Sequence, residues 1–284
     1  MSISEFVYTV LLKPAPLRRL ANRTILALLP RELGCRGVKL TINPTDPVIS
    51  GALLFGVYEN GELDLFEKLL RPGMTVVDVG ANIGLYTALA AKGVGPTGRV
   101  LALEPDPESF DFLRRTVARN GFGNVETCQL AASATTGDAD LYSNPDNRGD
   151  SRLYADPLLG DKPVAVRTTT VDELIRSRGI RGVDILKIDT QGAEGLVLAG
   201  ARETLANSPN LTILMEFWPY GLARTGSDAD AVIGLLRKIG FRIFDGGAKF
   251  RRLETDADFA NLVGRLQGRQ YTNLLASRTL ETAP

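Results

Sequence analysis

One eleven-residue segment, residues 76–86, constrains the fold of this chain more than any other. It begins as an apolar run and continues into the pattern Asp-x-Gly-x-Asn-x-Gly, formed by Asp78, Gly80, Asn82 and Gly84. The pattern predicts a buried strand, a tight turn and the start of a helix, because glycine adopts turn conformations that other residues avoid. Such a turn allows a nucleotide-like ligand to lie against bare backbone.

Predicted strands and helices alternate along most of the chain. Apolar runs predict strands at residues 75–80, 99–103, 124–130, 164–168, 183–189, 211–217, 241–244 and 271–277. Helical periodicity and end signals predict helices at residues 83–92, 107–120, 171–178, 193–205, 229–239 and 256–266. We therefore expect an α/β fold with helices on both faces of a mostly parallel sheet. Residues 133–162, rich in Asp, Asn, Gly and Pro, are predicted to be irregular.

Four acidic residues fall at or near the ends of predicted strands: Asp78, Glu104, Asp189 and Glu216. Ligands of such sheets bind beyond the carboxyl ends of the strands, so these side chains should line one rim. Glu104 could accept hydrogen bonds from the two ribose hydroxyls of a nucleoside. The alternative for Glu104 is a solvated acid favoured by the dipole of the helix that follows.

Composition narrows the chemistry. The chain contains no histidine, which excludes His-based triads, His-ligated zinc and a histidine base. The 33 basic and 33 acidic residues give zero net charge, so nothing indicates a nucleic-acid partner. Two distant cysteines fit neither a disulfide framework nor a metal site, and they favour a reducing cytoplasm.

Residues 1–50 are predicted to form an N-terminal extension to a catalytic domain at residues 51–284. Two short apolar runs, at residues 6–12 and 24–29, are too short to span a membrane. We expect a helical cap on the main domain, and the alternative is a helix lying on a membrane surface. The location expected is therefore cytoplasmic, with peripheral membrane contact and homo-oligomerisation left open.

A dinucleotide oxidoreductase also carries glycines after its first strand and an acid after its second. Its fingerprint is G-x-G-x-x-G, whereas Gly80, Asn82 and Gly84 here form G-x-N-x-G. Asp78 would crowd a pyrophosphate and suits a cationic ligand, such as the methionine end of S-adenosylmethionine. An NAD-dependent oxidoreductase and a non-catalytic nucleotide-binding, membrane-associated protein are the alternative functions.

From about residue 55 to residue 277, the chain resembles the FkbM-type S-adenosylmethionine-dependent methyltransferases. The matching segments are residues 58–59, 78–84, 104–105, 184–194 and 216–219. The resemblance implies a Rossmann-like class I methyltransferase fold, a seven-stranded sheet in which the last strand, residues 271–277, is antiparallel. Where this chain has Thr190 and Gln191, many relatives carry Val and Glu, which alters the charge near the site.

The resemblance also implies which residues hold the cofactor, S-adenosylmethionine. Asp78 and the glycine turn would hold the methionine moiety, Glu104 the ribose, and the residues after the third strand the adenine. The complete predicted cofactor-binding set is Glu59, Asp78, Gly80, Ala81, Asn82, Gly84, Glu104, Pro105, Ala131 and Ala132.

Methyl transfer to a hydroxyl requires a positioned acceptor and benefits from a base. Asp189 is the first candidate, with Glu194 and Glu216 as catalytic alternatives. Glu194 could instead be a helix-start acid, and Glu216 could orient loops. A divalent cation held by Asp189, Glu216 and Asp150 is an alternative that we do not favour. Lys187 is as consistent with a structural ion pair as with a role on substrate.

The irregular stretch is long for a compact domain, and such loops tend to be lids or binding loops. Its Arg148, Asp150, Arg152 and Tyr154 are predicted to grip a hydroxylated or anionic substrate, and a solvated loop is the alternative. Trp218, the only tryptophan, either stacks on a sugar or fills the core. The sequence therefore predicts an S-adenosylmethionine-dependent O-methyltransferase acting on a sugar, glycan or secondary metabolite, with the acceptor unidentified.

Overall fold

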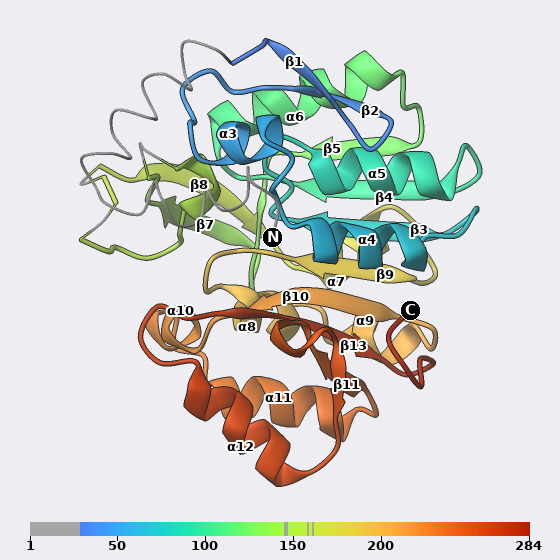
Figure 1. Cartoon of the computed structure of the whole chain (residues 1–284), viewed down its shortest axis with the longest axis vertical. Coiled ribbons are helices and arrows are strands. Elements are labelled where there is room, and N and C mark those ends of the chain that lie inside the picture. Colours follow the sequence, from blue (N-terminus) through green and yellow to red (C-terminus); the bar gives the residue numbers. More distant parts are fainter. Residues whose placement is uncertain (1–28, 145–146, 158, 161) are drawn as a thin grey trace.

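A computed structural model describes residues 29–144, 147–157, 159–160 and 162–284. Its centre is a twisted sheet of eight strands in the order β12-β11-β13-β10-β9-β3-β4-β5 (Figure 1). The strands are β3 (Thr75–Val79), β4 (Arg99–Leu103), β5 (Val125–Cys128), β9 (Ile185–Ile188), β10 (Thr212–Phe217), β11 (Arg242–Asp245), β12 (Arg251–Leu253) and β13 (Thr272–Ser277).

The sheet is parallel from β5 through β10. β13 lies between β10 and β11 and is antiparallel to both, as predicted for the last strand. The predicted number of strands was too low by one, because β12 pairs with β11 at the edge of the sheet. Its sequence, Arg-Arg-Leu, is too short and too polar to stand out as a strand. Strand order reverses between β3 and β9, so a binding crevice is expected where those strands end.

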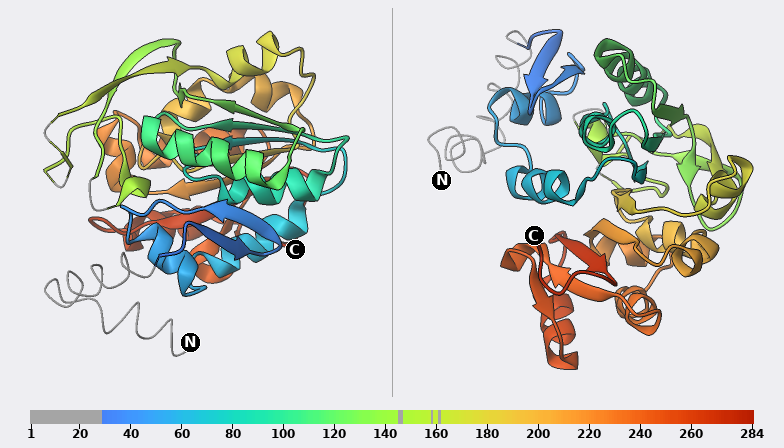
Figure 2. Two further views of the ribbon diagram at one scale, coloured as in Figure 1. Left: turned by 90° about the horizontal axis from the view of Figure 1, so that it is seen from above. Right: turned by 90° about the vertical axis from the view of Figure 1, so that its right-hand side faces the viewer.

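Helices cover both faces of the sheet (Figures 1 and 2). In chain order they are α3 (Ile49–Leu54), α4 (Asn60–Leu69), α5 (Leu85–Val94), α6 (Pro107–Asn120), α7 (Val171–Ser177), α8 (Glu194–Ala199), α9 (Arg202–Asn207), α10 (Pro219–Arg224), α11 (Ala229–Lys238) and α12 (Asp256–Arg265). The single helix predicted at residues 193–205 is divided into α8 and α9. The reason is that the carbonyl of Gly200 accepts the amide of Asp172 at the start of α7 instead of continuing a helix.

The strands bury alternate side chains in two apolar cores, one on each face of the sheet. In β3, Val77 and Val79 pack with residues of α7, α8 and α11. Val76 packs on the opposite face, with residues of α4 and α5. The same alternation turns the side chain of Asp78 toward α5, and this decides where that carboxylate lies relative to the site.

The extension predicted to be helical contains a β-hairpin where the structure describes it. β1 (Glu32–Cys35) pairs antiparallel with β2 (Val38–Thr41) around a two-residue turn. The hairpin lies beside α6 (Figure 2), and the amide of Thr41 donates to Thr116 Oγ1 at 3.1 Å. Both apolar runs assigned to the cap or membrane contact fall within residues 1–28, apart from Leu29, outside the described residues. Among the helices that the structure describes, none is long and apolar enough to cross a membrane.

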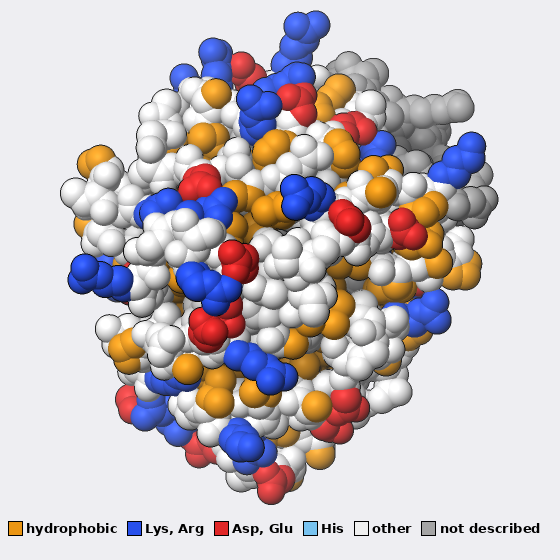
Figure 3. All heavy atoms as spheres, turned by 180° about the vertical axis from the view of Figure 1, so that it is seen from behind, with side chains coloured by type: hydrophobic (Ala, Val, Ile, Leu, Met, Phe, Trp, Pro, Cys, Tyr) orange, Lys and Arg blue, Asp and Glu red, His pale blue; other side chains and the backbone are white. Residues whose placement is uncertain are grey.

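Part of the stretch predicted to be irregular forms a second sheet. β7 (Gly137–Leu141) pairs antiparallel with β8 (Val164–Thr169), which in turn pairs parallel with β6 (Ala131–Ala132). The described residues between β7 and β8 contain a short 3-10 turn, Arg148–Asp150, and an antiparallel bridge between Tyr142 and Arg152. Figure 3 shows acidic and basic side chains interspersed over the face seen from behind.

Candidate active site

A cavity of about 400 Å³ lies at the carboxyl ends of β3, β4, β9 and β10. Its floor is the turn after β3 and its walls carry acids from the neighbouring strand ends. The segment at residues 147–153 lies along its outer side, together with Arg269 and Tyr271 before β13. Three of the four acids predicted to line one rim, Glu104, Asp189 and Glu216, line this cavity, whereas Asp78 does not. The cavity can bury most of a nucleoside-sized ligand.

The turn after β3 is held by backbone hydrogen bonds to β4 and by a close approach to the residue after β9. The amides of Gly80 and Ala81 donate to the carbonyl of Leu103 at 3.0 and 2.9 Å. A Cβ at position 80 would lie 1.8 Å from the carbonyl oxygen of Asp189, so the chain requires glycine there. Asn82 adopts φ +49°. Gly80, Ala81 and Asn82 line the cavity, whereas Gly84 does not, because it lies at the start of α5.

Asp78 lies beneath the cavity rather than on its wall. Its side chain is fully buried, and the hydroxyl of Thr87 in α5 donates to it at 2.6 Å. Lys187 Nζ lies 3.6 Å from Asp78 Oδ1 and donates to the carbonyl of Gly80 at 3.0 Å. Burial lowers the pKa of Lys187, but the carboxylates of Asp189 and Asp78 outweigh that effect and raise it. Asp78 therefore supports the turn through Lys187.

Glu104 follows β4 and lines the cavity with 6% of its surface exposed. One carboxylate oxygen accepts the amide of Asn82 and the other accepts the amide of Asp106, both at 2.8 Å. Burial raises the pKa of Glu104 to about 7, although the two backbone amides oppose the rise. Pro105, Ala131 and Ala132 line the cavity beside it.

Glu59 precedes α4 and enters the cavity wall from a left-handed conformation with φ +41°. The hydroxyl of Tyr86 donates to it at 2.8 Å. Burial raises the pKa of Glu59 to about 7, with a further contribution from the charge of Asp189. A non-glycine residue in this region is strained, and such strain recurs at functional sites.

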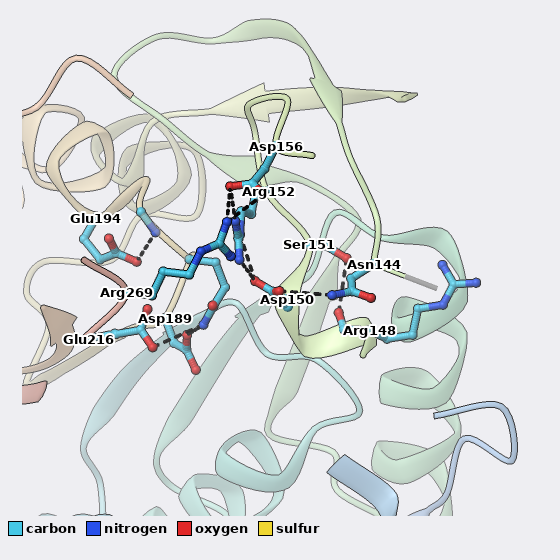
Figure 4. Close-up of polar contacts among 12 residues, drawn as sticks. Asn144, Arg148, Asp150, Ser151, Arg152, Asp156, Asp189, Glu194, Glu216 and Arg269 are labelled. Atoms are coloured by element: carbon cyan, nitrogen blue, oxygen red, sulfur yellow. Dashed lines mark hydrogen bonds and ion pairs between the residues drawn. The ribbon is translucent and has the colours of Figure 1, made fainter. Parts of the chain in front are cut away.

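Three side chains after β9 and at the end of β10 form one polar group on the wall (Figure 4). The side-chain amide of Gln191 donates to Asp189 Oδ1 at 2.9 Å and to Glu216 Oε2 at 3.3 Å. Lys187 Nζ lies 3.5 Å from the other oxygen of Asp189. Burial raises the pKa of Glu216 well above its usual value, and the charges of Asp189 and Glu194 raise it further.

Glu194 does not line the cavity. It is fully buried at the start of α8, where one carboxylate oxygen accepts the amide and hydroxyl of Thr190 and the amide of Gly192. These three hydrogen bonds fix the loop at residues 189–194 to the carboxylate of Glu194. Glu194 therefore fixes the loop that carries Asp189 and Gln191.

The outer segment is fastened by arginines. Arg152 is buried and forms ion pairs with Asp150 and Asp156 (Figure 4). Arg269, before β13, contacts the same Asp156 at 3.0 Å and thus joins the outer segment to the C-terminal strand. Arg148 forms an ion pair with Glu108 at 2.8 Å. Arg148, Asp150 and Arg152 line the cavity.

Two predicted substrate residues, Tyr154 and Trp218, are buried, and a core position was one of the two alternatives for Trp218. Tyr154 does not line the cavity, and the guanidinium of Arg152 lies 5.7 Å from the centre of its ring. Trp218 lines it but is 4% exposed, and it contacts the guanidinium of Arg152, 4.8 Å from its ring centre, and the ring of Tyr220 at 5.5 Å. The side chain of Trp218 is therefore largely covered by protein.

Sequence reasoning did not assign site roles to Tyr86, Gln191, Arg269 and Tyr271, all of which line the cavity. The last two lie about 80 residues beyond Gln191 in the sequence, and no local pattern places them at the site. Gln191 lies within the segment at residues 184–194 that carries the family resemblance, which was the available signal. Within the described ranges, no group of three acidic or cysteine side chains has the geometry to hold a metal ion.

The parallel sheet with an inserted antiparallel strand and the acidic rim around a glycine turn define a class I methyltransferase fold. The family model described as Methyltransferase FkbM domain matches residues 78–243, more than half of the chain. The chain belongs to this family.

The chain is also similar to individual methyltransferases. The chain is 32% identical over 161 residues to the 31-O-demethyl-FK506 methyltransferase FkbM of Streptomyces tacrolimicus, covering 47% of this chain and 62% of that protein. It is 27% identical over 158 residues to the 2-O-methyltransferase NoeI of Sinorhizobium fredii, covering 49% and 62%. The chain thus spans about three-fifths of the length of the curated relatives it matches. A crystal structure of a methyltransferase FkbM from Methylobacillus flagellatus KT has 17% identity and a TM-score of 0.43, covering 92% of this chain and 59% of that one.

Proposed function

We propose that this protein is an S-adenosylmethionine-dependent O-methyltransferase that acts on a hydroxyl group of a sugar, a glycan or a secondary metabolite. The observation that carries the proposal is the meeting of Glu104, the glycine turn and Asp189 around one cavity. The names of the relatives, 31-O-demethyl-FK506 methyltransferase and 2-O-methyltransferase, support an oxygen acceptor.

The lining residues fit the cofactor. Each oxygen of Glu104 accepts one backbone amide and retains a lone pair, so the carboxylate can also accept bonds from two ribose hydroxyls. Ala131 and Ala132 leave room for a flat base beside it. The acids Glu59 and Asp189 suit the positive end of the molecule. When bound, S-adenosylmethionine supplies a methyl group on a cationic sulfur, and S-adenosylhomocysteine remains after transfer.

The protein's contribution is to position the acceptor and to receive its proton. Asp189 lines the cavity and its side chain is 26% exposed, so a hydroxyl group in the cavity can reach it. We assign Asp189 to accept the proton as the new carbon–oxygen bond forms. The fixed loop around Glu194 holds Asp189 in place, and such positioning supplies much of the rate in transfers of this kind.

The alternatives have less support. A dinucleotide oxidoreductase would require room for a pyrophosphate at the turn, and membership of a methyltransferase family speaks against it. A scaffold without catalytic activity would not need a carboxylate at the end of each neighbouring strand.

Labelled S-adenosylmethionine, offered with a panel of sugars, glycans and hydroxylated metabolites, tests the proposal. We expect label in at least one hydroxyl-bearing acceptor with the wild type, and loss of that transfer in Asp189→Asn without loss of folding. Transfer only to nitrogen or carbon would contradict the oxygen acceptor, and full activity of Asp189→Asn would reject Asp189 as the base.

A further inference from the structure

The polar group formed by Asp189, Gln191 and Glu216 contains more than a base needs. Asp189 has a cation beside it, because Lys187 Nζ lies 3.5 Å away. Glu216 is buried, with 8% of the residue exposed. Among the described residues, it has no cation within ion-pair distance, in contrast to Asp189. The two carboxyl groups therefore share a donor, Gln191, but differ in their electrostatic surroundings.

Three acids raise the pKa of Glu216 through their charges. Asp189 approaches from the end of β9, Glu194 from the start of α8 and Glu59 from the segment before α4. Each of them raises the pKa of Glu216 in addition to its burial, and the hydrogen bond from the side-chain amide of Gln191 acts in the opposite direction. Burial and these charges therefore favour the protonated form of Glu216, which can donate a hydrogen bond.

Two buried polar atoms on this wall have no hydrogen-bond partner among the described residues. One is Glu216 Oε1, and the other is Trp218 Nε1, two residues further along the chain. Both side chains line the cavity. Buried polar groups in proteins are normally paired, so orphaned atoms at a cavity wall indicate that a ligand completes them.

Gln191 occupies its position at a conformational cost. Its φ is +53°, in the left-handed region that disfavours a residue with a Cβ. The conformation places its amide between the two carboxyl groups, and the next residue, Gly192, is tied to Glu194. An outlier at a site, maintained by the surrounding structure, points to a positioning role.

We propose that the acceptor carries two neighbouring hydroxyl groups, one facing Asp189 and the other hydrogen-bonded to Glu216, with Gln191 as the positioning residue that holds the two acids in register. The proposal rests on the proposed function, because Asp189 is taken as the base there. It gives Glu216 a role in choosing the acceptor rather than in removing a proton. A site built to bond a second hydroxyl group rejects an analogue that lacks it.

The test compares trans-cyclohexane-1,2-diol with cyclohexanol, which differ by one hydroxyl group. Dissociation constants are measured by ligand-observed NMR, with and without saturating S-adenosylhomocysteine. We expect the wild type to bind the diol roughly tenfold more tightly or better. Equal affinities, or no detectable binding of the diol, would overturn the proposal.

Variants separate the role of each residue. Glu216→Gln retains a neutral donor and should keep the preference for the diol, whereas Glu216→Leu and Gln191→Ala should lose it. A preference that survives Glu216→Leu in a folded protein would contradict the proposal. Calorimetry with S-adenosylhomocysteine on the same variants reports the proposed function separately, because its binding does not require Glu216 or Gln191.

A second measurement remains informative if Glu216→Leu does not fold. In protein labelled with ¹³C at glutamate carboxyl carbons, the signal that disappears in Glu216→Gln belongs to Glu216. At pH 7.5 it should have the shift of a neutral acid in the wild type. The shift of an ionised carboxylate would remove the proposed donor and overturn the inference.

Discussion

Lys187 Nζ lies 3.6 Å from the carboxylate of Asp78, and both side chains are buried beneath the turn that follows β3. The ammonium group also donates to the carbonyl of Gly80, so one buried ion pair supports the floor of the cavity. The segment at residues 76–86, which is the most diagnostic of function in the sequence, thus contains an acid, Asp78, whose role is to support the turn. Asp78 can affect a ligand only indirectly, because it supports the turn that lines the cavity.

Removal of Lys187 should therefore destabilise the protein strongly. Lys187→Met leaves Asp78 buried without its cation, which costs about 3 to 5 kcal/mol when one partner of a buried pair is lost. Asp78→Asn combined with Lys187→Met should recover much of the loss, because neither charge then remains unpaired. Urea unfolding measures the free energy of each variant. A loss below about 1 kcal/mol for Lys187→Met would show that the pair does not support the turn.

The turn itself should tolerate no side chain at position 80. Gly80→Ala places a Cβ 1.8 Å from the carbonyl oxygen of Asp189, at a residue with φ +76°. We expect a loss of at least about 3 kcal/mol or failure to fold. Gly234→Ala is the matched control, since position 234 lies in α11 with no atom within 4 Å of the added Cβ. That control should gain up to about 1 kcal/mol, and similar unfolding curves for the two variants would refute the close approach.

Glu104 should govern the affinity for S-adenosylhomocysteine and its dependence on pH. Glu104→Ala removes charge-assisted hydrogen bonds worth roughly 1.5 to 3 kcal/mol, a loss of about 10- to 150-fold in affinity. In the wild type, affinity should rise between pH 6 and pH 8, because the carboxylate with a pKa of about 7 ionises over that range. Calorimetry across the range measures both effects. Glu203→Gln, at an exposed residue in α9, is the control and should leave them unchanged.

The stability of the ligand-free protein should change with pH in the opposite direction. Glu59 and Glu104 have pKa values of about 7 in the folded protein against the usual 4.5. Because the folded protein binds these protons more tightly, their contribution to the free energy of unfolding is fully present below about pH 4.5 and is lost as pH rises through 7. The shift at Glu104 corresponds to roughly 3 kcal/mol. The melting temperature should therefore fall between pH 5 and pH 8, and Glu59→Gln should reduce the slope. A melting temperature that rises over this interval would contradict the burial of these acids.

Local patterns predicted the parts of the site that depend on neighbouring residues. The glycine turn and the start of α6 at Pro107, both predicted, are set within a few residues of sequence. The position of Asp78 was not predictable from the motif alone, because it depends on which face of β3 packs against α5. Arg269 reaches Asp156 across 113 residues, and such a contact leaves no local signal.

The hairpin illustrates a signal that was present but not recognised. Val38, Leu40 and Ile42 alternate with polar residues, and Arg36-Gly37, with φ values of +50° and +80°, forms the turn that a two-residue hairpin requires. The apolar runs at residues 6–12 and 24–29 favoured a helix for the whole extension. β7 was missed for another reason, since the sequence Gly-Asp-Ala-Asp-Leu has too few apolar residues to suggest a strand.

The central claim is that the cavity around Glu104 and the glycine turn binds S-adenosylmethionine rather than a dinucleotide. Isothermal titration of the folded wild-type protein at pH 8, first with S-adenosylhomocysteine and then with NAD, tests it most directly. We expect saturable heat with S-adenosylhomocysteine at one site per chain and none with NAD. Saturable binding of NAD, or no heat with S-adenosylhomocysteine, would contradict it.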